Sequence, residues 1–406
     1  MKHERFTVSP SKKAVLLELA LLQIFVVVLY LLMRSGATTP AEREENDTVF
    51  NATRDILVVP TNNGSFLCGY SPGSRKVRGG CILTCAVPNS TNKRFNCHMR
   101  GNRTDEQYEV ADILVNHRRV LPVHRRGGPP YLTLLYSGES KESLGYYGTE
   151  SYLRRHDMVI SCHHYRKHYY TWARQHAKLF ASIVEGNRAR PVPEEQLWDE
   201  WASRLSAVAV FSSSSAAHRG EFVDELSMHY PVHSYGRFMR TNATPAECSH
   251  LEDRYELKMC VLRNYKYAIA LENTEENDYV TEKVYHALLA GSIPIYWGAP
   301  NVDEFVPMGS GSIINVKDFL PGRLGRRGNW SAGNVSEEVG RFAAHLSRLE
   351  HDEAAVKHML AWRTATDERT WGRKFLDNLH HEDPTCAACA EALVRRNRVT
   401  QRSRVN

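Results

Sequence analysis

Residues 265–300 read YKYAIALENTEENDYVTEKVYHALLAGSIPIYWGAP, and this stretch decides the fold. A hydrophobic run, 267–271, ends at an acid-amide pair, and a polar loop leads to a helix start at 278–283. After Gly291 a second hydrophobic run follows at 293–297. The pattern predicts strand, loop, helix and strand in one unit, and the polar edge of such a unit is where open α/β sheets bind ligands. The polar residues at this edge are Glu272, Asn273, Tyr279, Glu282 and Lys283.

Strands and helices alternate in the rest of the body as well. Short hydrophobic runs predict buried strands at 110–115, 131–136, 158–161, 207–211, 232–235 and 313–316. Helices are expected at 147–155, from Arg219 and from Ser336. The alternation is typical of parallel sheets with right-handed crossovers, arranged here as two tandem α/β domains that face a cleft.

The composition indicates a globular body. Of the 406 residues, 42% are hydrophobic and 24% charged, which is ordinary for folded domains. The net charge of +6 is modest, and basic residues gather only in the C-terminal tail. Nucleic-acid binders concentrate charge on one face and carry a recognisable module, so no nucleic-acid partner is expected.

The N-terminus has the pattern of a membrane anchor. Residues 14–33 are apolar except for Glu18 and Gln23, a length that suits a bilayer. Positive charges precede this run, so the N-terminus is expected in the cytosol and the body across the membrane. A cleaved signal peptide is the alternative, but the run is long for one and no clean cleavage site follows.

Glycosylation sequons and cysteines agree with a luminal body. The sequons lie at Asn46, Asn51, Asn63, Asn89, Asn102, Asn242, Asn329 and Asn334. Cys68, Cys81, Cys85 and Cys97 form a cluster typical of a disulfide-bonded segment. The C-x-x-C at Cys386 and Cys389 is interpreted as a disulfide, because a zinc site would need a second ligand pair. Nine cysteines leave at least one unpaired or intermolecular.

These patterns divide the chain into six expected parts. They are a cytosolic tail (1–13), a transmembrane signal anchor (14–33), a stem and cysteine-bearing segment (34–107), an N-terminal domain (108–204), a C-terminal domain (205–375) and a C-terminal segment with the C-x-x-C and basic tail (376–406).

The motifs resemble those of the α1,3-fucosyltransferases of glycosyltransferase family 10. YKYAIALEN, DYVTEK and ALLAGSIPIYWGAPN are similar to the family's signature region. RGEFVDEL (219–226) and the segment 233–237 resemble its Arg-led helix and the strand end that follows. Residues 137–140, with the pair Tyr146 and Tyr147, resemble its catalytic region, most closely that of the plant-type core α1,3-fucosyltransferases. The resemblance covers about 108–394 and is strongest from 219 to 320.

The resemblance implies a GT-B fold, with two Rossmann-like domains preceded by a single transmembrane helix and a stem. GDP-fucose would bind the C-terminal domain and a glycan or glycoprotein acceptor the N-terminal one. The implied reaction is inverting α1,3-transfer of fucose to a GlcNAc hydroxyl of the N-glycan core, by a single-pass type II Golgi membrane enzyme. No tightly bound cofactor is expected, and no metal site is expected because no D-x-D loop is present. A divalent cation would at most stimulate the transfer reaction.

The family motif assigns roles to individual residues, each with a plainer alternative. Glu139 is the expected base, although an arbitrary loop glutamate is more often only solvated. Arg219 begins a helix and is expected at the diphosphate, unless it is an exposed helix-start arginine. Asn273, Tyr279, Glu282 and Lys283 are the expected donor-binding residues, or else a helix-capping cluster. His117 is the acceptor-side candidate, and a structural histidine is the alternative.

One departure from the family pattern concerns the strand before Arg219. The family has Ser-Asn there, whereas this chain has four serines at 212–215. That change keeps a catalytically inactive, lectin-like luminal protein open as an alternative. Fucosylation of outer-chain N-acetyllactosamine or other protein-linked sugars is a second alternative, because the choice of acceptor lies in loops of the first domain, about 108–200.

Overall fold

The computed structural model describes residues 55–60, 68, 74–88, 90, 92–100, 110–116, 131–163, 168–213, 219–237, 239–320, 335–380 and 383–402. The expected anchor, most of the stem, His117, Ser214, Ser215 and every sequon except Asn242 lie outside these residues. Within them, no helix has both the length and the apolar content needed to cross a membrane.

The expected C-terminal domain is built on a five-stranded parallel sheet of order β10-β9-β11-β12-β13. Its strands are β9 (Leu205–Val210), β10 (Val232–Ser234), β11 (Tyr265–Leu271), β12 (Ile293–Trp297) and β13 (Ile314–Asn315). All seven residues of the central strand, β11, are buried. The parallel strands and the unit β11–α11–β12, with α11 at Glu282–Ala290, confirm the prediction from the opening stretch.

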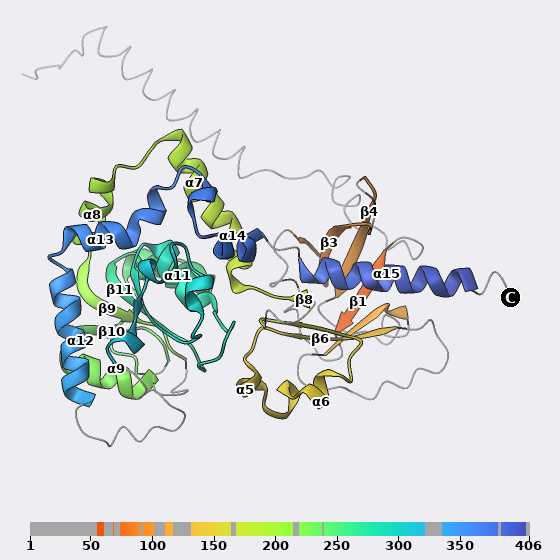
Figure 1. Cartoon of the computed structure of the whole chain (residues 1–406), viewed down its shortest axis with the longest axis horizontal. Coiled ribbons are helices and arrows are strands. Elements are labelled where there is room, and N and C mark those ends of the chain that lie inside the picture. The colour runs from red at the N-terminus through yellow and green to blue at the C-terminus, as the bar shows by residue number, and fades with distance from the viewer. Residues whose placement is uncertain are drawn as a thin grey trace, which may run out of the picture. The chain divides into compact units, whose positions relative to one another are not determined.

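Helices cover both faces of this sheet, as parallel sheets require (Figure 1). On one face the side chains of β11 pack against α8 (Glu194–Ala202), α9 (Arg219–Ser227), α12 (Val335–Leu349) and α13 (Glu353–Leu360). On the other face they pack against α10 (Arg254–Leu262) and α11. Gly291 ends α11 in the left-handed conformation at φ +75°, where a side chain would collide with Arg363.

The other sheet has eight strands in the order β2-β3-β4-β1-β5-β6-β7-β8. They are β1 (Ile56–Pro60), β2 (Arg75–Val77), β3 (Gly80–Ala86), β4 (Arg94–Arg100), β5 (Ile113–Asn116), β6 (Leu132–Ser137), β7 (Met158–Ser161) and β8 (His168–Tyr169). From β4 to β8 the neighbours are parallel, whereas β2, β3 and β4 form an antiparallel edge.

The expected start of the N-terminal domain at residue 108 is therefore wrong. Strands β1 to β4, between residues 56 and 100, belong to its sheet rather than to a stem. Polar residues and cysteines interrupt the apolar runs of β3 and β4, so neither shows a clear hydrophobic period. Their burial comes from sheet pairing and from the helix above them, which local sequence does not reveal.

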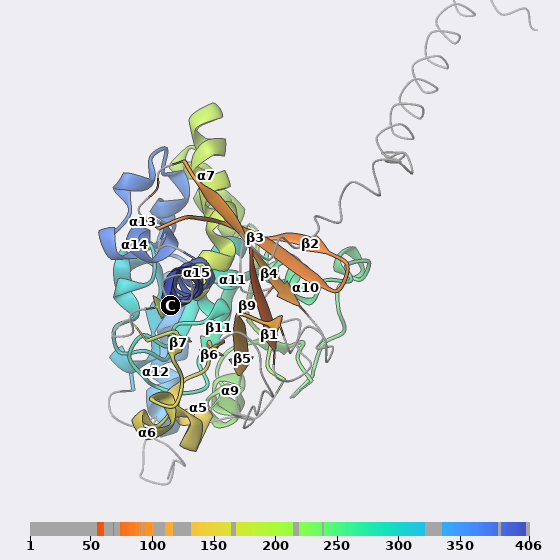
Figure 2. The same ribbon diagram turned by 90° about the vertical axis from the view of Figure 1, so that its right-hand side faces the viewer.

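The C-terminal segment also belongs to this first domain. After α7 (Ala177–Ala189) and α8 the chain builds the second sheet, and then returns through α14 (Arg373–His380) to α15 (Pro384–Arg402). Helix α15 packs against β1, β3, β7 and β8 (Figures 1 and 2). The boundary expected at 376 falls inside α14, and the helix that follows belongs with the first sheet rather than with a separate C-terminal segment.

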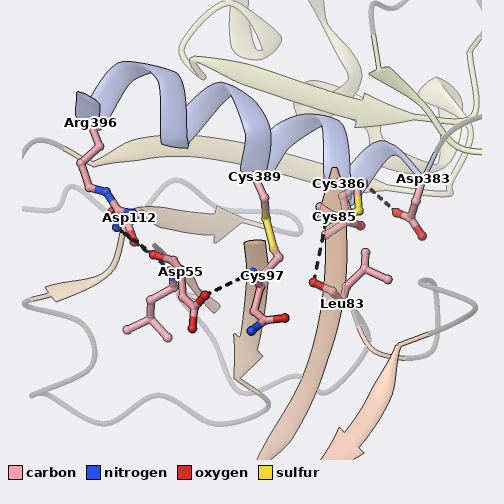
Figure 3. The surroundings of a disulfide bond; sticks show 12 residues. Asp55, Leu83, Cys85, Cys97, Asp112, Asp383, Cys386, Cys389 and Arg396 are labelled. Carbon is pink, nitrogen blue, oxygen red and sulfur yellow. Dashed lines mark hydrogen bonds and ion pairs between the residues drawn. A yellow bond between two sulfur atoms is a disulfide. The ribbon is translucent and has the colours of Figure 1, made fainter. Parts of the chain in front are cut away.

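Two disulfides fasten α15 to the sheet, and they correct the interpretation of the C-x-x-C. Cys386 bonds to Cys85 of β3 and Cys389 to Cys97 of β4, so the two cysteines do not pair with each other (Figure 3). Residues three apart lie on one face of a helix, so both sulfurs face the strands below. Arg396 lies seven residues further along α15 than Cys389. Its Nη1 donates to the carbonyl oxygen of Asp55 over 2.8 Å.

The remaining cysteines complete the pattern. Cys68 bonds to Cys81 within the expected cluster, and Cys248 bonds to Cys260, a pair that the sequence pattern did not suggest. Cys162 is buried and free, which confirms that at least one cysteine is unpaired.

The long-range pairing can be checked by non-reducing peptide mapping after trypsin digestion. We expect peptide 375–395, which carries Cys386 and Cys389, to be linked to peptides 79–93 and 95–100 until a reductant is added. A free peptide 375–395 with an internal disulfide would contradict this arrangement.

Candidate active site

Arg219 is the first polar residue of the site, and its guanidinium is held from two sides. The side chain lies at the start of α9 and is 6% exposed. Nη1 donates to Oγ of Ser212 over 2.9 Å, and Nη2 donates to Oδ1 of Asn273 over 2.7 Å. Among the residues that the structure describes, Nε has no hydrogen-bond partner. Burial lowers the pKa of Arg219, and the nearby Glu272 opposes that shift.

Glu272 closes β11 and is a structural carboxylate. Its two oxygens accept from the backbone N–H and the hydroxyl of Thr281, each over 2.7 Å. The ammonium of Lys283 donates to Oε2 over 3.0 Å. Since the Glu272 side chain has no exposed surface, these bonds hold the start of α11 against the end of β11. These contacts make Glu272 the buried member of an ion pair with Lys283.

Lys283 and Glu282 occupy the first turn of α11. Besides Glu272, Lys283 donates to Oγ1 of Thr281 over 2.8 Å and lies 3.7 Å from Oε1 of Glu282. Burial lowers the pKa of Lys283, but Glu272 and Glu282 raise it more, so the net shift is upward. Burial raises the pKa of Glu282, yet Lys283 and Lys258 bring it below its usual value. Both side chains are thus charged near neutral pH.

Lys258, on α10, is a third cation in this region, and no sequence motif pointed to it. Its side chain is half-buried, and burial lowers its pKa to about 8. Glu282 opposes that shift, while Lys283 and Arg219 add to it. Arg219, Lys258 and Lys283 are therefore close enough to feel one another's charge, and such a group of cations suits an anionic ligand.

Tyr279 connects this cation-bearing region to the other domain. It is 2% exposed, and its hydroxyl donates to Oε2 of Glu139 over 3.1 Å. Nδ2 of Asn273 lies 3.5 Å from the same hydroxyl. Burial raises the pKa of the Tyr279 phenol well above its usual value, and Glu272 and Glu139 add to the shift, so the phenol stays protonated as a donor.

Glu139 follows β6, at the carboxyl end of a parallel strand. Gly138 packs so closely on the indole of Trp172 that a Cβ there would lie 2.9 Å from the ring. Nε1 of Trp172 donates to the carbonyl oxygen of Gly138 over 3.3 Å. After Glu139, Ser140 caps α5 (Lys141–Leu144) by accepting from the amide of Ser143. The carboxylate thus stands on a short loop fixed at both ends.

The structure brings together most of the residues that the sequence singled out. Glu139, Tyr279, Asn273 and Arg219 form one hydrogen-bonded chain. Glu282 and Lys283 form a second group with Glu272, and the charges of Glu272 and Glu282 act on Arg219. His117 lies outside the described residues, so its place in the site stays a prediction. Among the residues that the structure describes, no three His, Cys, Asp or Glu side chains are grouped as metal ligands would be.

Ser212 and Lys258 are the site residues that the sequence did not identify. Ser212 is the first serine of the run that departs from the family pattern, and its hydroxyl oxygen accepts a hydrogen bond from Arg219. The family pattern could have suggested that the serine run faces the site, but the arginine contact depends on the fold.

Two α/β units with a carboxylate on one and a group of cations on the other have an arrangement that suits a two-domain glycosyltransferase. Residues 201–325 match the model of the family described as "Glycosyltransferase family 10 (fucosyltransferase) C-term". This match makes the second domain similar to the C-terminal part of that family, and together with the relatives below it supports the class of glycosyltransferases.

Individual relatives agree on the class but differ in their named linkages. The chain is 28% identical over 330 residues to an α-(1,4)-fucosyltransferase of Arabidopsis thaliana, covering 76% of this chain and 71% of the relative. An α-(1,3)-fucosyltransferase B of Drosophila melanogaster is 34% identical over 30% of this chain and 28% of its own length. A GDP-fucose protein O-fucosyltransferase 3 of Xenopus laevis is 26% identical over 42% and 35%.

The fold resembles that of a solved α1,3-fucosyltransferase with GDP. The TM-score is 0.50 at 18% sequence identity, over 86% of this chain and 93% of the other. This likeness bears on the α/β fold, with its parallel sheets, rather than on activity.

Replacing Glu272 by Ala should destabilise the protein by about 3–5 kcal/mol, because the Lys283 ammonium and the Thr281 amide would lose their buried partner. Urea unfolding of the purified chain measures the change. Glu337→Ala is the control, since this residue pairs with Arg341 on the exposed face of α12 and its loss should cost under about 0.5 kcal/mol. Equal losses in the two variants would contradict the structural role of Glu272.

Proposed function

We propose that this chain transfers fucose from GDP-fucose to a sugar hydroxyl, with inversion at the anomeric carbon and with Glu139 as the base. The observation that carries the proposal is the hydrogen bond between the Tyr279 hydroxyl and Glu139 Oε2. Through Tyr279 and Asn273 the carboxylate is linked to Arg219, so a donor held by its phosphates at Arg219 would have the base beside its sugar.

In the proposed reaction the acceptor hydroxyl loses its proton to the Glu139 carboxylate while its oxygen attacks the anomeric carbon. The bond between that carbon and the phosphate oxygen breaks, and its electron pair leaves with GDP. Glu139 later returns the proton to water. Tyr279 orients the carboxylate and remains protonated throughout.

The leaving diphosphate gains negative charge as the bond breaks, and the cations of the second domain supply its counter-charge. Arg219 has an Nε without a partner among the described residues and stands at the start of α9, where the helix dipole also favours an anion. Lys283 and Lys258 add two more positive charges on the same side. Glu282 is suited to accept hydrogen bonds from ribose hydroxyls.

For the acceptor we propose a GlcNAc of the N-glycan core, joined in α1,3-linkage. The support is the resemblance of the Glu139 region to plant-type core fucosyltransferases. Relatives named for α1,4-linkage and for protein O-fucosylation make those acceptors the alternatives. We also propose a type II Golgi membrane protein with a luminal body, supported by the apolar run 14–33, the sequons and the four disulfides.

An acceptor panel tests the activity. The purified chain is incubated with GDP-fucose and with N-glycan cores, N-acetyllactosamine glycans and folded glycoprotein domains, and mass spectrometry detects the gain of one fucose. Modification of the core alone supports the proposed acceptor. Intact binding of GDP-fucose without transfer to any acceptor would instead favour a lectin-like protein.

Glu139→Gln should lower the transfer rate by about 10²–10⁴-fold, because the amide cannot take the proton. The affinity for GDP, measured by calorimetry, should change little, since Glu139 stands outside the cation group. Glu142→Gln is the matched control in the same segment and should keep most of the activity. Near-normal turnover by Glu139→Gln would mean that another group is the base.

The binding of GDP should weaken as the pH rises through about 8, because Lys258 is charged below its lowered pKa and neutral above it. We expect roughly a tenfold loss in affinity between pH 7 and pH 9, since bound phosphate raises the pKa of the ammonium. Lys258→Arg should flatten this dependence, because arginine does not titrate in that range. The same slope in the wild type and in Lys258→Arg would exclude Lys258 as its source.

A further inference from the structure

Glu276 reaches across from the second domain to the loop that carries Glu139. It lies in the segment between β11 and α11, three residues before Tyr279. Its Oε2 accepts from the backbone amide of Lys141 over 3.0 Å. Lys141 is the first residue of α5, two positions after Glu139, so this contact acts directly on the loop that presents the base.

The second oxygen of Glu276 faces the neighbouring strand of the first domain. Oε1 lies 3.4 Å from Nε2 of His163, a 4%-exposed residue that follows β7. The adjacent Cys162 is also buried, and its Sγ lies 3.8 Å from the carbonyl oxygen of Glu139. Glu276 therefore contacts two segments that flank Glu139, one after β6 and one after β7.

A rigid turn sets the direction of Glu276. Asp278 has a positive φ of 69°, which is unfavourable for a residue with a side chain. Asn301 holds it there reciprocally: Oδ1 accepts from the Asp278 amide, and Nδ2 donates to Oδ1 of Asp278, both over 2.9 Å. The amide of Tyr279 lies 3.2 Å from the carbonyl oxygen of Glu276. Glu276 and Tyr279 thus belong to one turn, and both face the Glu139 loop.

We propose that Glu276 is a positioning residue for the base: by binding the Lys141 amide and His163 it fixes the loop of the first domain so that Glu139 meets the Tyr279 hydroxyl. This inference rests on the proposed function. Burial raises the pKa of Glu276, while the amides of Glu142 and Lys141 oppose that shift, which agrees with a carboxylate that is committed to protein contacts.

The proposal predicts an effect on turnover rather than on donor binding. Small displacements of a reacting group cost up to about 100-fold in rate, because the aligned geometry is lost. Glu276 is not part of the cation group, so the affinity for GDP should not depend on it. A purely structural role would lower the stability and the number of GDP-binding sites, and with them the apparent kcat, so kcat is expressed per GDP-binding site measured by calorimetry.

The test compares Glu276→Ala with Lys141→Pro in the full-length chain. Lys141→Pro removes the amide that donates to Glu276 but keeps α5, because proline is favoured at the first position of a helix and Ser140 is extended. Each variant should lower kcat about 10–100-fold, with the KM for GDP-fucose within about twofold of the wild type. Because both remove the same contact, the double variant should be no worse than either one alone.

Two controls separate this contact from its surroundings. Lys141→Ala removes the side chain but keeps the amide, and Glu275→Gln alters the neighbouring acid, whose contacts to Trp297 and Lys317 stay within the second domain. Both should keep kcat within about twofold of the wild type. Equal losses in Lys141→Ala and Lys141→Pro, or additive losses in the double variant, would overturn the proposal.

Amide exchange gives a readout that does not need activity. Residues 139–145 should exchange faster in Glu276→Ala than in the wild type or in Glu275→Gln, as followed by mass spectrometry of that peptide. If the wild type transferred no fucose, the proposed function would fail, and this measurement alone would decide the contact. Faster exchange would support it, and unchanged exchange would overturn it.

Discussion

The polar edge of the second sheet depends on one carboxylate that has no access to water. A carboxylate inside the protein, such as that of Glu272, needs partners for both of its oxygens, because an unpaired buried charge costs several kcal/mol. Thr281 and Lys283 supply those partners, and both lie at the start of α11. The end of β11 and the start of α11 are therefore fixed relative to each other, and so is the segment between them.

That constraint explains why the intervening segment can reach into the other domain without losing its shape. Tyr279 and Glu276 lie between the two anchored ends, and the reciprocal bonds of Asp278 and Asn301 add a third fixed point. The contact to Glu139 is thus made by a preorganised turn rather than by a side chain that must be ordered during each turnover. In physical terms, the entropy of arranging Glu139 beside Tyr279 and Arg219 has already been lost on folding.

The sequence predicted the second domain better than the first. Each run in 265–300 has one clear hydrophobic period, and the runs correspond to β11, α11 and β12 near their expected bounds. Strands β3 and β4 were missed because their burial comes from sheet pairing and from α15, which lies about 290 residues further on. The same reason made the C-x-x-C misleading: two cysteines on one helix face look like partners until the strands beneath them are known.

The candidate site shows the same limit. Glu139, Arg219, Asn273, Tyr279, Glu282 and Lys283 could be named because each belongs to a local motif. Ser212, Lys258, Glu276 and His163 could not, because what defines them is a neighbour from a distant part of the chain or a shared electrostatic environment. Local pattern thus identifies the residues that carry a motif, whereas the groups that orient them emerge only from tertiary packing.

The return of α15 to the first sheet has a consequence for how the protein is made. Cys85 and Cys97 leave the ribosome some 300 residues before their partners. Their two disulfides therefore cannot form until the whole second domain has been synthesised. During that interval either thiol can form a wrong disulfide with Cys81, which is close by. Attack by another thiolate would then be needed to break that wrong disulfide. The two domains are consequently interdependent during biosynthesis. A chain that stops before α15 would leave the domain that bears Glu139 without its covering helix, even though that domain is translated first.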